Sequence, residues 1–226
     1  MGFVVHVLAP DHAAPVPAAP VVLAPLPPSR RLPVVYRIRD IVLGSALVLV
    51  ATPLLLLVGV AVFVGLGWPV FYADPRVGLD GRMFRMWKFR TMPRHAHLVP
   101  VSRNDADGPR FKARADPRVG RLGRFLRRSS LDELPQLVQV VTGRLTLVGP
   151  RPMPPAEVRQ YDDLARQRLR VKPGVTGLWQ ISGRSDLSFE RSIALDVDYV
   201  ISQSLRRDLV ILLRTPAAVL SRRGAY

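Results

Sequence analysis

The pattern of apolar and polar positions is dominated by one long apolar run. No charged residue occurs between Asp40 and Asp74, and a helix needs only about 20 such residues to cross a bilayer core of about 30 Å. The run begins too late in the chain and is too long for a secretory signal peptide. It therefore predicts a retained membrane-embedded segment over residues 34–73.

Pro53 lies inside this segment, directly after Thr52. A proline within a helix lacks its N–H and its ring clashes with the preceding turn, so the helix bends or breaks, and Thr52 can return its hydroxyl to the backbone. One interpretation is a single kinked spanning helix, which the residues alone favour slightly because proline is common in spanning helices. The other is a re-entrant hairpin, because each half is too short to cross the membrane.

The rest of the chain shows mainly helical periodicity. Apolar spacing predicts helices over residues 132–142, 155–171, 187–203 and 205–220, with Gly143 ending the first and Pro216 bending the last. A basic amphipathic helix or turn is expected where arginines recur every three residues, at Arg118, Arg121, Arg124 and Arg127.

Strand signals are weak and are limited to residues 145–148 and 176–181. Glycine turns alternate with short apolar groups over 77–92, and the polar stretch 93–114 is expected to be a mobile loop. The predicted class is therefore mainly α with minor β. A disordered Pro/Ala-rich arm is expected over 1–33, before the membrane segment. A compact domain with amphipathic interfacial helices is expected over 74–226.

The charge balance indicates an anionic partner. Lysine and arginine number 33 against 17 acidic residues, for a net charge of +16, which suits nucleic acid, an anionic membrane or phosphorylated substrates. Aromatic residues are sparse among the basic ones, so nucleic acid is not the partner we expect. Basic residues lie on both sides of the apolar run, which favours the cytoplasmic side for both. Cysteine is absent, so disulfides and thiolate metal sites are excluded.

Candidate chemistry is concentrated in the run Ser129-Ser130-Leu131-Asp132-Glu133-Leu134-Pro135-Gln136-Leu137. Two adjacent carboxylates follow two arginines there, a combination that suits chemistry on phosphate. The spacing of Ser130 and Glu133 also matches a capping box, the commoner reason for such a pattern at the start of a helix. Taken alone, the capping interpretation is the better one.

Three further blocks change that assessment. Lys88-Phe89-Arg90-Thr91-Met92 precedes the acidic pair, and two blocks follow it: Leu147-Val148-Gly149-Pro150-Arg151-Pro152 and Lys172-Pro173-Gly174-Val175-Thr176-Gly177-Leu178-Trp179-Gln180-Ile181-Ser182-Gly183-Arg184. In this order, from about residue 36 to 220, the chain resembles the bacterial sugar transferases, which transfer a sugar 1-phosphate to a polyprenyl phosphate.

The resemblance implies a reaction and roles for particular residues. A sugar 1-phosphate would pass from a UDP-sugar to undecaprenyl phosphate with release of UMP, as the first membrane step of exopolysaccharide, capsule, O-antigen or glycoconjugate assembly. Asp132 would be the nucleophile that carries the phospho-sugar, and Glu133 would help to hold Mg²⁺ together with Asp196. Substrate phosphate would be bound by basic residues from each block: Arg127, Arg151, Lys88, Arg90, Lys172 and Arg184.

The resemblance also bears on topology and location. In short members of the family a Ser-Pro pair breaks the membrane helix so that it dips into one leaflet, and Thr52-Pro53 takes that place here. We therefore expect a re-entrant hairpin broken at Pro53, on the cytoplasmic face of the inner (plasma) membrane, in contact with membrane lipid. A homodimer is plausible. The chain departs from the family pattern at Asp74, Gln139 and Arg206, where Gln, Asn and Trp are usual.

Two other classes of protein remain as alternatives. A membrane-tethered basic protein could bind anionic lipid or nucleic acid without catalysis. A catalytically inactive relative could serve as an assembly scaffold, although its reacting residues are intact in this sequence.

Overall fold

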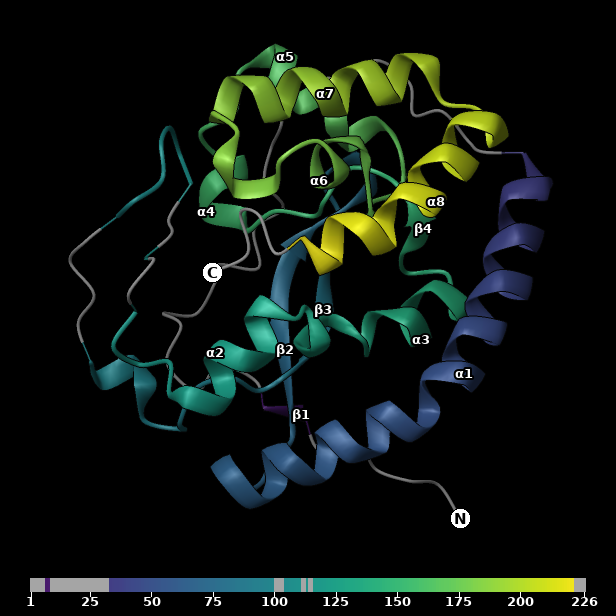
Figure 1. The fold of residues 1–226 in the computed structure, drawn as a ribbon. Coiled ribbons are helices and arrows are strands. Elements are labelled where there is room, and N and C mark those ends of the chain that lie inside the picture. The colour runs from purple at the N-terminus through teal and green to yellow at the C-terminus, as the bar shows by residue number, and fades with distance from the viewer. Residues whose placement is uncertain (1–6, 9–32, 100–103, 111–112, 114–115, 222–226) are drawn as a thin grey trace.

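The computed structural model describes residues 7–8, 33–99, 104–110, 113 and 116–221. Its described part is mainly helical, with two small sheets (Figure 1). The expectation of a disordered arm over 1–33 falls almost wholly outside these residues. The exception is β1 (Val7–Leu8), which pairs in parallel with β2 (Phe71–Val77).

The apolar run forms one continuous helix, α1 (Val34–Leu66), of 33 residues. Pro53 lies inside it, and the Thr52 hydroxyl donates a 2.8 Å hydrogen bond to the carbonyl of Val48, a contact that tends to bend helices. Figure 1 shows α1 descending along one side of the domain and then turning beneath it. The proline therefore bends the helix and does not divide it into two helices, and the helix ends before residue 73.

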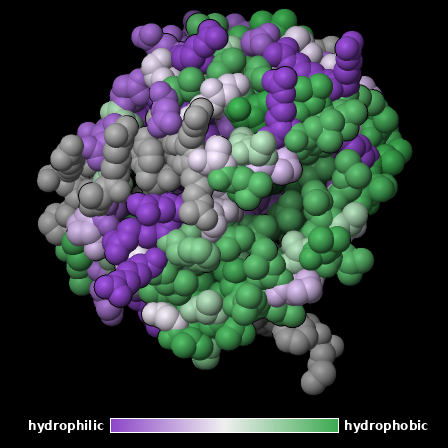
Figure 2. All heavy atoms as spheres, viewed as in Figure 1, coloured by the Kyte–Doolittle hydropathy of each residue, from purple (hydrophilic) through white to green (hydrophobic). Residues whose placement is uncertain are grey.

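Much of α1 is not covered by the rest of the chain. Leu49, Val50 and Val64 are each at least 75 % exposed, and apolar residues gather over this side of the molecule in Figure 2. The helix is long and apolar enough to cross a membrane. A soluble protein rarely leaves an apolar patch of this extent in water, so membrane anchoring through α1 is plausible.

A β-hairpin follows the membrane helix directly. Strand β2 pairs antiparallel with β3 (Met83–Phe89) through the short turn η1 (Leu79–Gly81), and Phe71 lies opposite Phe89 with the two rings stacked 5.2 Å apart. The sequence pattern predicts only turns and short apolar groups here. Strand β2 carries two charged residues and Pro75, which blurs the alternation that marks a strand.

The second sheet has two parallel strands, β4 (Thr146–Val148) and β5 (Gly174–Thr176). Glycine is required where they meet, because a Cβ on Gly174 would lie 2.1 Å from the backbone nitrogen of Gly149. The strand expected at 145–148 is confirmed. The strand expected at 176–181 is wrong beyond Thr176, because residues there form the short helix α6 (Leu178–Ile181).

The two C-terminal helices agree with prediction. α7 (Phe189–Ser202) and α8 (Leu205–Leu220) begin at Ser188 and Ser204, whose side chains accept hydrogen bonds from the backbone nitrogens of Arg191 and Arg207. Pro216 lies within α8 and does not end it, and the bend expected at this residue stays a prediction. Serine is a preferred residue at these positions because its oxygen satisfies a free N–H of the first turn.

The expected helix over 155–171 is wrong. Three short pieces lie there, α4 (Pro155–Val158), α5 (Asp163–Arg166) and η4 (Gln167–Arg170). The side chain of Asp162 accepts a 2.7 Å bond from the nitrogen of Ala165 and so starts a new helix in the middle of the predicted one. An apolar period does not reveal such an internal start.

The acidic run forms two elements in place of the single helix expected over 132–142. η3 (Leu131–Glu133) is followed by α3 (Gln136–Val141), which ends before Gly143 at a positive φ of 81°. The basic stretch before it forms α2 (Arg121–Arg128). Two further short turns complete the described elements, η2 (Ala96–Leu98) within the expected loop and η5 (Arg184–Asp186) after α6.

Both ends of α1 are held by the rest of the domain. At its start, Arg37 donates to the carbonyls of Val140 and Val141 at the end of α3, at 2.8 and 2.6 Å. At its other end an apolar cluster joins α1, β3 and α2, with Val58, Val62, Val70, Phe89 and Leu126 buried together. The acidic run follows α2 and precedes α3 in the chain. It therefore lies between two helices that each contact one end of α1.

Candidate active site

The adjacent carboxylates of Asp132 and Glu133 are not part of a capping box. Ser130 adopts a left-handed conformation with φ of 58°, and its side chain caps nothing. Only the backbone nitrogen of Glu133 contacts Ser130, at its carbonyl, while the Glu133 side chain instead reaches two cationic side chains. The capping interpretation of the Ser130–Glu133 spacing is therefore wrong. A left-handed non-glycine residue is strained, and such strain is common beside functional groups.

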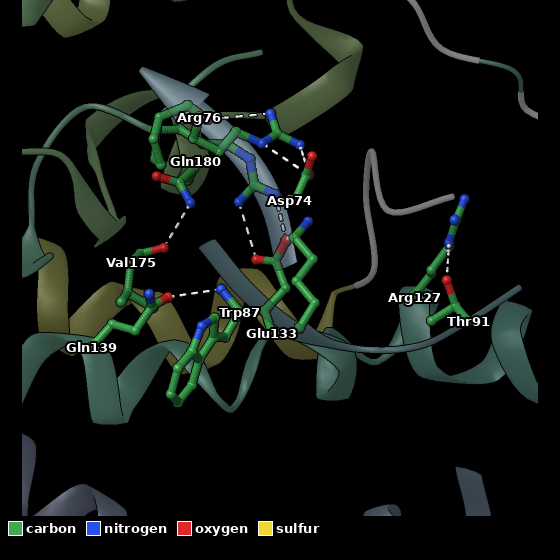
Figure 3. A network of polar contacts seen from close by, with 12 residues as sticks. Asp74, Arg76, Trp87, Thr91, Arg127, Glu133, Gln139, Val175 and Gln180 are labelled. Atoms are coloured by element: carbon green, nitrogen blue, oxygen red, sulfur yellow. Dashed lines mark hydrogen bonds and ion pairs between the residues drawn. The ribbon is translucent and has the colours of Figure 1, made fainter. Parts of the chain in front are cut away.

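Glu133 is gripped by basic residues from two other blocks. The ammonium of Lys88, in β3, lies 3.0 Å from Oε1, and Arg151 donates Nη1 to Oε2 at 3.0 Å and Nη2 to Oε1. Figure 3 shows Glu133 at the centre of this network, below Asp74 and Arg76. Arg151 and Lys88 hold the pKa of Glu133 well below its usual range despite burial. Glu133 is therefore ionised at neutral pH.

Asp132 differs from its neighbour in both contacts and protonation. Its residue is 7 % exposed, and within the described part of the chain its carboxylate makes no hydrogen bond or ion pair. Burial first, and then the charge of Glu133, raise the pKa of Asp132 to about 6, against the opposing effect of Lys88, Arg127 and Arg151. A carboxylate that is ionised near neutral pH and has no partner is free to act as a nucleophile.

Two further predicted arginines belong to the same electrostatic environment. Arg127 donates its Nε to the hydroxyl of Thr91 at 3.0 Å, and its charge acts on Asp132. Burial lowers the pKa of Arg184 below its usual value, and the charge of Glu133 offsets only part of this effect. Arg184 has a φ of 53°, so the site contains a second left-handed non-glycine residue. Four predicted cations, Lys88, Arg127, Arg151 and Arg184, therefore act on the acidic pair.

Arg90 and Lys172 are placed elsewhere. Arg90 is 4 % exposed and donates its Nη2 to the last carbonyls of α1, those of Leu66 and Gly67. Lys172 lies near the start of α1, where burial and then the charge of Arg37 lower its pKa. The contacts of Arg90 close the end of a helix. In the described structure neither Arg90 nor Lys172 makes a hydrogen bond or ion pair with the acidic pair, and their contact with substrate phosphate stays a prediction.

Asp196, expected to help Glu133 hold a metal, instead forms a buried ion pair with Arg168. Both side chains are at most 2 % exposed. Among the described residues no group of three His, Cys, Asp or Glu side chains could hold a metal ion. The predicted ligand pair of Glu133 and Asp196 is therefore not supported by the contacts of Asp196.

The acidic pair nevertheless fits a magnesium ion. Mg²⁺ is usually bound by one or two carboxylates together with substrate phosphates and water. Glu133 accepts three hydrogen bonds, which leaves about one of the roughly four lone-pair positions of a carboxylate. Asp132 beside it offers oxygens that no described residue engages. Phosphate oxygens would have to complete the coordination.

Several polar residues of the site were missed by the sequence analysis. Arg168 donates to the carbonyl of Arg151 at 3.0 Å, and Arg76 donates to that of Pro152 at 3.3 Å while it pairs with Asp74. Gln139 joins α3 to β3, because its amide donates to the carbonyl of Arg85 at 2.7 Å and its oxygen accepts from the nitrogen of Trp87 at 2.8 Å. Asp74 and Gln139 had been noticed only as departures from the family pattern.

Comparison with known proteins identifies the family of the chain. The family model described as "Bacterial sugar transferase" matches residues 32–222, which include the acidic pair and the cations around it. The chain therefore belongs to the bacterial sugar transferase family.

Named relatives have related descriptions. The chain is 40 % identical over 195 residues to the undecaprenyl-phosphate galactose phosphotransferase of Salmonella typhimurium. The matched region is 83 % of this chain and 40 % of that relative. It is 36 % identical over 219 residues to the UDP-glucose:undecaprenyl-phosphate glucose-1-phosphate transferase of Escherichia coli. That matched region is 93 % of this chain and 45 % of the relative. Several curated relatives are thus much longer than the region they share with this chain.

A relative of similar length also matches. The exopolysaccharide production protein ExoY of Rhizobium meliloti is 42 % identical over 195 residues, which are 83 % of this chain and 86 % of that protein.

Proposed function

We propose that this protein transfers a sugar 1-phosphate from a UDP-sugar to undecaprenyl phosphate, as an early membrane step of polysaccharide or glycoconjugate assembly. The observation that carries the proposal is the contrast between the two adjacent carboxylates. Glu133 is held ionised by Lys88 and Arg151, whereas Asp132 has no partner among the described residues and a pKa near 6. The names of the relatives supply the substrate classes.

The proposed reaction has two displacements at one phosphorus atom. An oxygen of Asp132 attacks the phosphorus that bears the sugar, a new P–O bond forms, and the bond to the bridging oxygen breaks so that UMP leaves with that oxygen. An oxygen of undecaprenyl phosphate then attacks the same phosphorus and releases the Asp132 carboxylate. Splitting the transfer in this way replaces one difficult step by two easier ones.

The cations around the pair would stabilise the negative charge of both steps. Arg151 and Lys88 already face Glu133, and Arg127 acts on Asp132. Fixed donors at a buried site stabilise developing charge better than mobile water does. Mg²⁺, held by Glu133 and by phosphate oxygens of the substrate, would neutralise the diphosphate and improve its leaving group.

For the membrane part we propose that α1 dips into the cytoplasmic leaflet and returns to the same face. The bend of α1, its exposed apolar residues and the position of Pro53 support this arrangement. α2 presents Arg121, Arg124 and Arg128 on one exposed face, around a hollow of about 250 Å³ that Phe125 also lines. A face with these residues suits anionic headgroups, so α2 would lie at the interface.

The first test is UMP release by purified protein with undecaprenyl phosphate, Mg²⁺ and a panel of UDP-sugars. We expect release with one sugar, and a rate below about one thousandth of it for Asp132→Asn, which keeps the size of the side chain and removes the nucleophile. Asp80→Asn, at an exposed position in η1, is the matched control and should retain full activity. Equal release by Asp132→Asn would exclude Asp132 as the nucleophile.

The same test distinguishes the proposed transferase from the main alternative, a membrane-tethered basic protein without catalysis. Such a protein would release no UMP with any sugar. Its binding to anionic vesicles would be unchanged by Asp132→Asn but lost in Arg124→Glu.

A further inference from the structure

The segment Pro150–Arg151–Pro152–Met153 is held through its carbonyl oxygens. Two of its four residues are prolines, which have no N–H to donate. Each of the four successive carbonyls accepts a hydrogen bond from a different donor: Gly174 N to Pro150 at 3.0 Å, Arg168 Nη2 to Arg151 at 3.0 Å, Arg76 Nη1 to Pro152 at 3.3 Å and Val77 N to Met153 at 3.0 Å. The conformation of this segment therefore depends on those donors.

Arg168 is the only fully buried charge among the four donors. Its side chain is 2 % exposed, and its guanidinium contacts three groups: the Arg151 carbonyl, the hydroxyl of Tyr161 at 2.8 Å and the carboxylate of Asp196. The Tyr161 hydroxyl in turn donates to Glu157 at 2.8 Å. These groups lie within the apolar cluster that contains Ile193 and Val197 of α7.

A buried ion pair is a poor way to stabilise such a core. Removing two charges from water costs several kcal/mol, and replacing the pair by apolar residues of similar volume is often neutral or stabilising. The pair is also incompletely satisfied, because Asp196 Oδ1 and Arg168 Nε are buried without a hydrogen-bond partner in the described structure. A role in fixing one geometry explains the pair better than a role in stability does.

We propose that Arg168, with Asp196 as its counter-ion, is a positioning residue that fixes the backbone of Arg151 so that its guanidinium meets Glu133 at two points. Arg168 binds the carbonyl of the same residue whose Nη1 lies 3.0 Å from Glu133 Oε2. A two-point contact between guanidinium and carboxylate is sensitive to small displacements of either group. This inference gives Asp196 a role without a metal, and its kinetic part rests on the proposed transferase function.

The decisive variant is Arg168→Lys. Lysine keeps the positive charge beside Asp196, but a single ammonium cannot reproduce the fork that reaches Arg151, Tyr161 and Asp196 together. We expect kcat/KM for the UDP-sugar to fall about tenfold to a hundredfold, as displacement of a positioned group does. In an Arg151→Ala background the same change should have less than about a twofold further effect, because coupled residues are not additive.

A second readout needs no substrate. Hydrogen–deuterium exchange of a peptide that contains Arg151 and Met153 should be at least about fivefold faster in Arg168→Lys than in the wild type. The matched control is Asp198→Asn on the exposed side of α7, whose carboxylate pairs with Arg207, and it should leave both exchange and kinetics unchanged. Because exchange does not require turnover, failure of the proposed reaction and failure of this inference can be told apart.

Tyr161→Phe provides a milder variant in case Arg168→Lys does not fold. It keeps the ring 5.7 Å from the guanidinium carbon and removes only the hydroxyl that Arg168 contacts, so exchange of the Arg151 peptide should again rise. Unchanged exchange in folded variants would overturn the inference. So would kinetic losses that simply multiply with those of Arg151→Ala, since they would show that Arg168 acts independently of Arg151.

Discussion

Arg151 and Glu133 form a two-point ion pair, in which Nη1 lies 3.0 Å from Oε2 and Nη2 bonds Oε1. The pair joins two blocks of the sequence through residues that lie 18 positions apart in the chain. Its effect is to fix one carboxylate of the acidic run as an anion while the adjacent one, on Asp132, stays without a hydrogen bond in the described structure. Most of our predictions concern this division of roles.

Arg151→Lys should separate charge from geometry. The variant keeps a cation near Glu133 but loses the planar two-point contact, so we expect kcat/KM to fall about a hundredfold with little change in thermal stability. Steady-state UMP release checks this expectation, and Arg159→Lys at an exposed position is the control. Wild-type activity in Arg151→Lys would show that the charge alone is sufficient.

The rate of UMP release should depend on pH through the ionisation of the Asp132 carboxylate. Its pKa is raised to about 6, so the protonated, non-nucleophilic form accumulates as the pH falls through 6. We expect a rate that is constant above about pH 7 and that falls about tenfold for each unit well below 6. A rate that stays level down to pH 4.5 would contradict the assignment of this pKa to the nucleophile.

Removal of divalent cations should abolish turnover, and Glu133→Gln should change the response to Mg²⁺. The variant loses the anion that would hold the ion, so half-maximal activity should require at least about tenfold more Mg²⁺. Titration of activity with Mg²⁺ after EDTA treatment tests this. Asp196→Asn should leave the Mg²⁺ requirement unchanged, because Asp196 pairs with Arg168, and a matching increase in that variant would restore Asp196 as a metal ligand.

Arg90→Met should lower stability more than catalysis. Arg90 donates to the final carbonyls of α1, and loss of hydrogen bonds to a charged group costs about 2–3 kcal/mol. We expect a lower unfolding temperature in detergent, while UMP release per folded molecule stays within about threefold of wild type. A large loss of activity at unchanged stability would instead support the phosphate-binding role expected from the sequence.

Pro53→Ala tests the re-entrant topology of α1. Alanine restores the missing N–H and removes the ring, so the helix should straighten and span the membrane. Because the chain has no cysteine, a single cysteine at the exposed Val34 can be labelled selectively. A membrane-impermeant reagent outside the inner membrane should not reach it in the Val34→Cys parent but should reach it when Pro53→Ala is added to that parent. Labelling already in the Val34→Cys parent would exclude the re-entrant arrangement.

The sequence predicted correctly those helices whose apolar residues recur at helical spacing and whose first turn is preceded by a capping residue. α7 and α8 have both, since each begins at a serine that caps it. The hairpin of β2 and β3 was missed because charged residues and Pro75 interrupt the alternation of β2. The helix over 155–171 was overpredicted because the period continues across Asp162, where the chain starts a new helix.

The candidate site was predicted as a set of residue types but not as contacts. The motifs named Lys88, Arg151 and Glu133 as candidate site residues, and the structure brings their side chains into contact. They could not show that Arg90 turns towards the end of α1. Arg90 is two positions after Lys88 and would share its face if the strand continued, but β3 ends at Phe89. Arg168 lies outside every motif, and nothing in the sequence marks its buried contact with Arg151.

The attachment of α1 has a practical consequence for engineering a water-soluble form. Arg39 of α1 bonds the carboxylate of Asp208 in α8, which is completely buried, and Asp40 accepts a 3.3 Å hydrogen bond from the backbone nitrogen of Leu147 in β4. Deleting the helix up to Leu66 would leave a buried carboxylate and a strand amide without these partners. A truncation that preserves the catalytic domain must therefore keep the first turns of α1 and replace only the apolar surface beyond them.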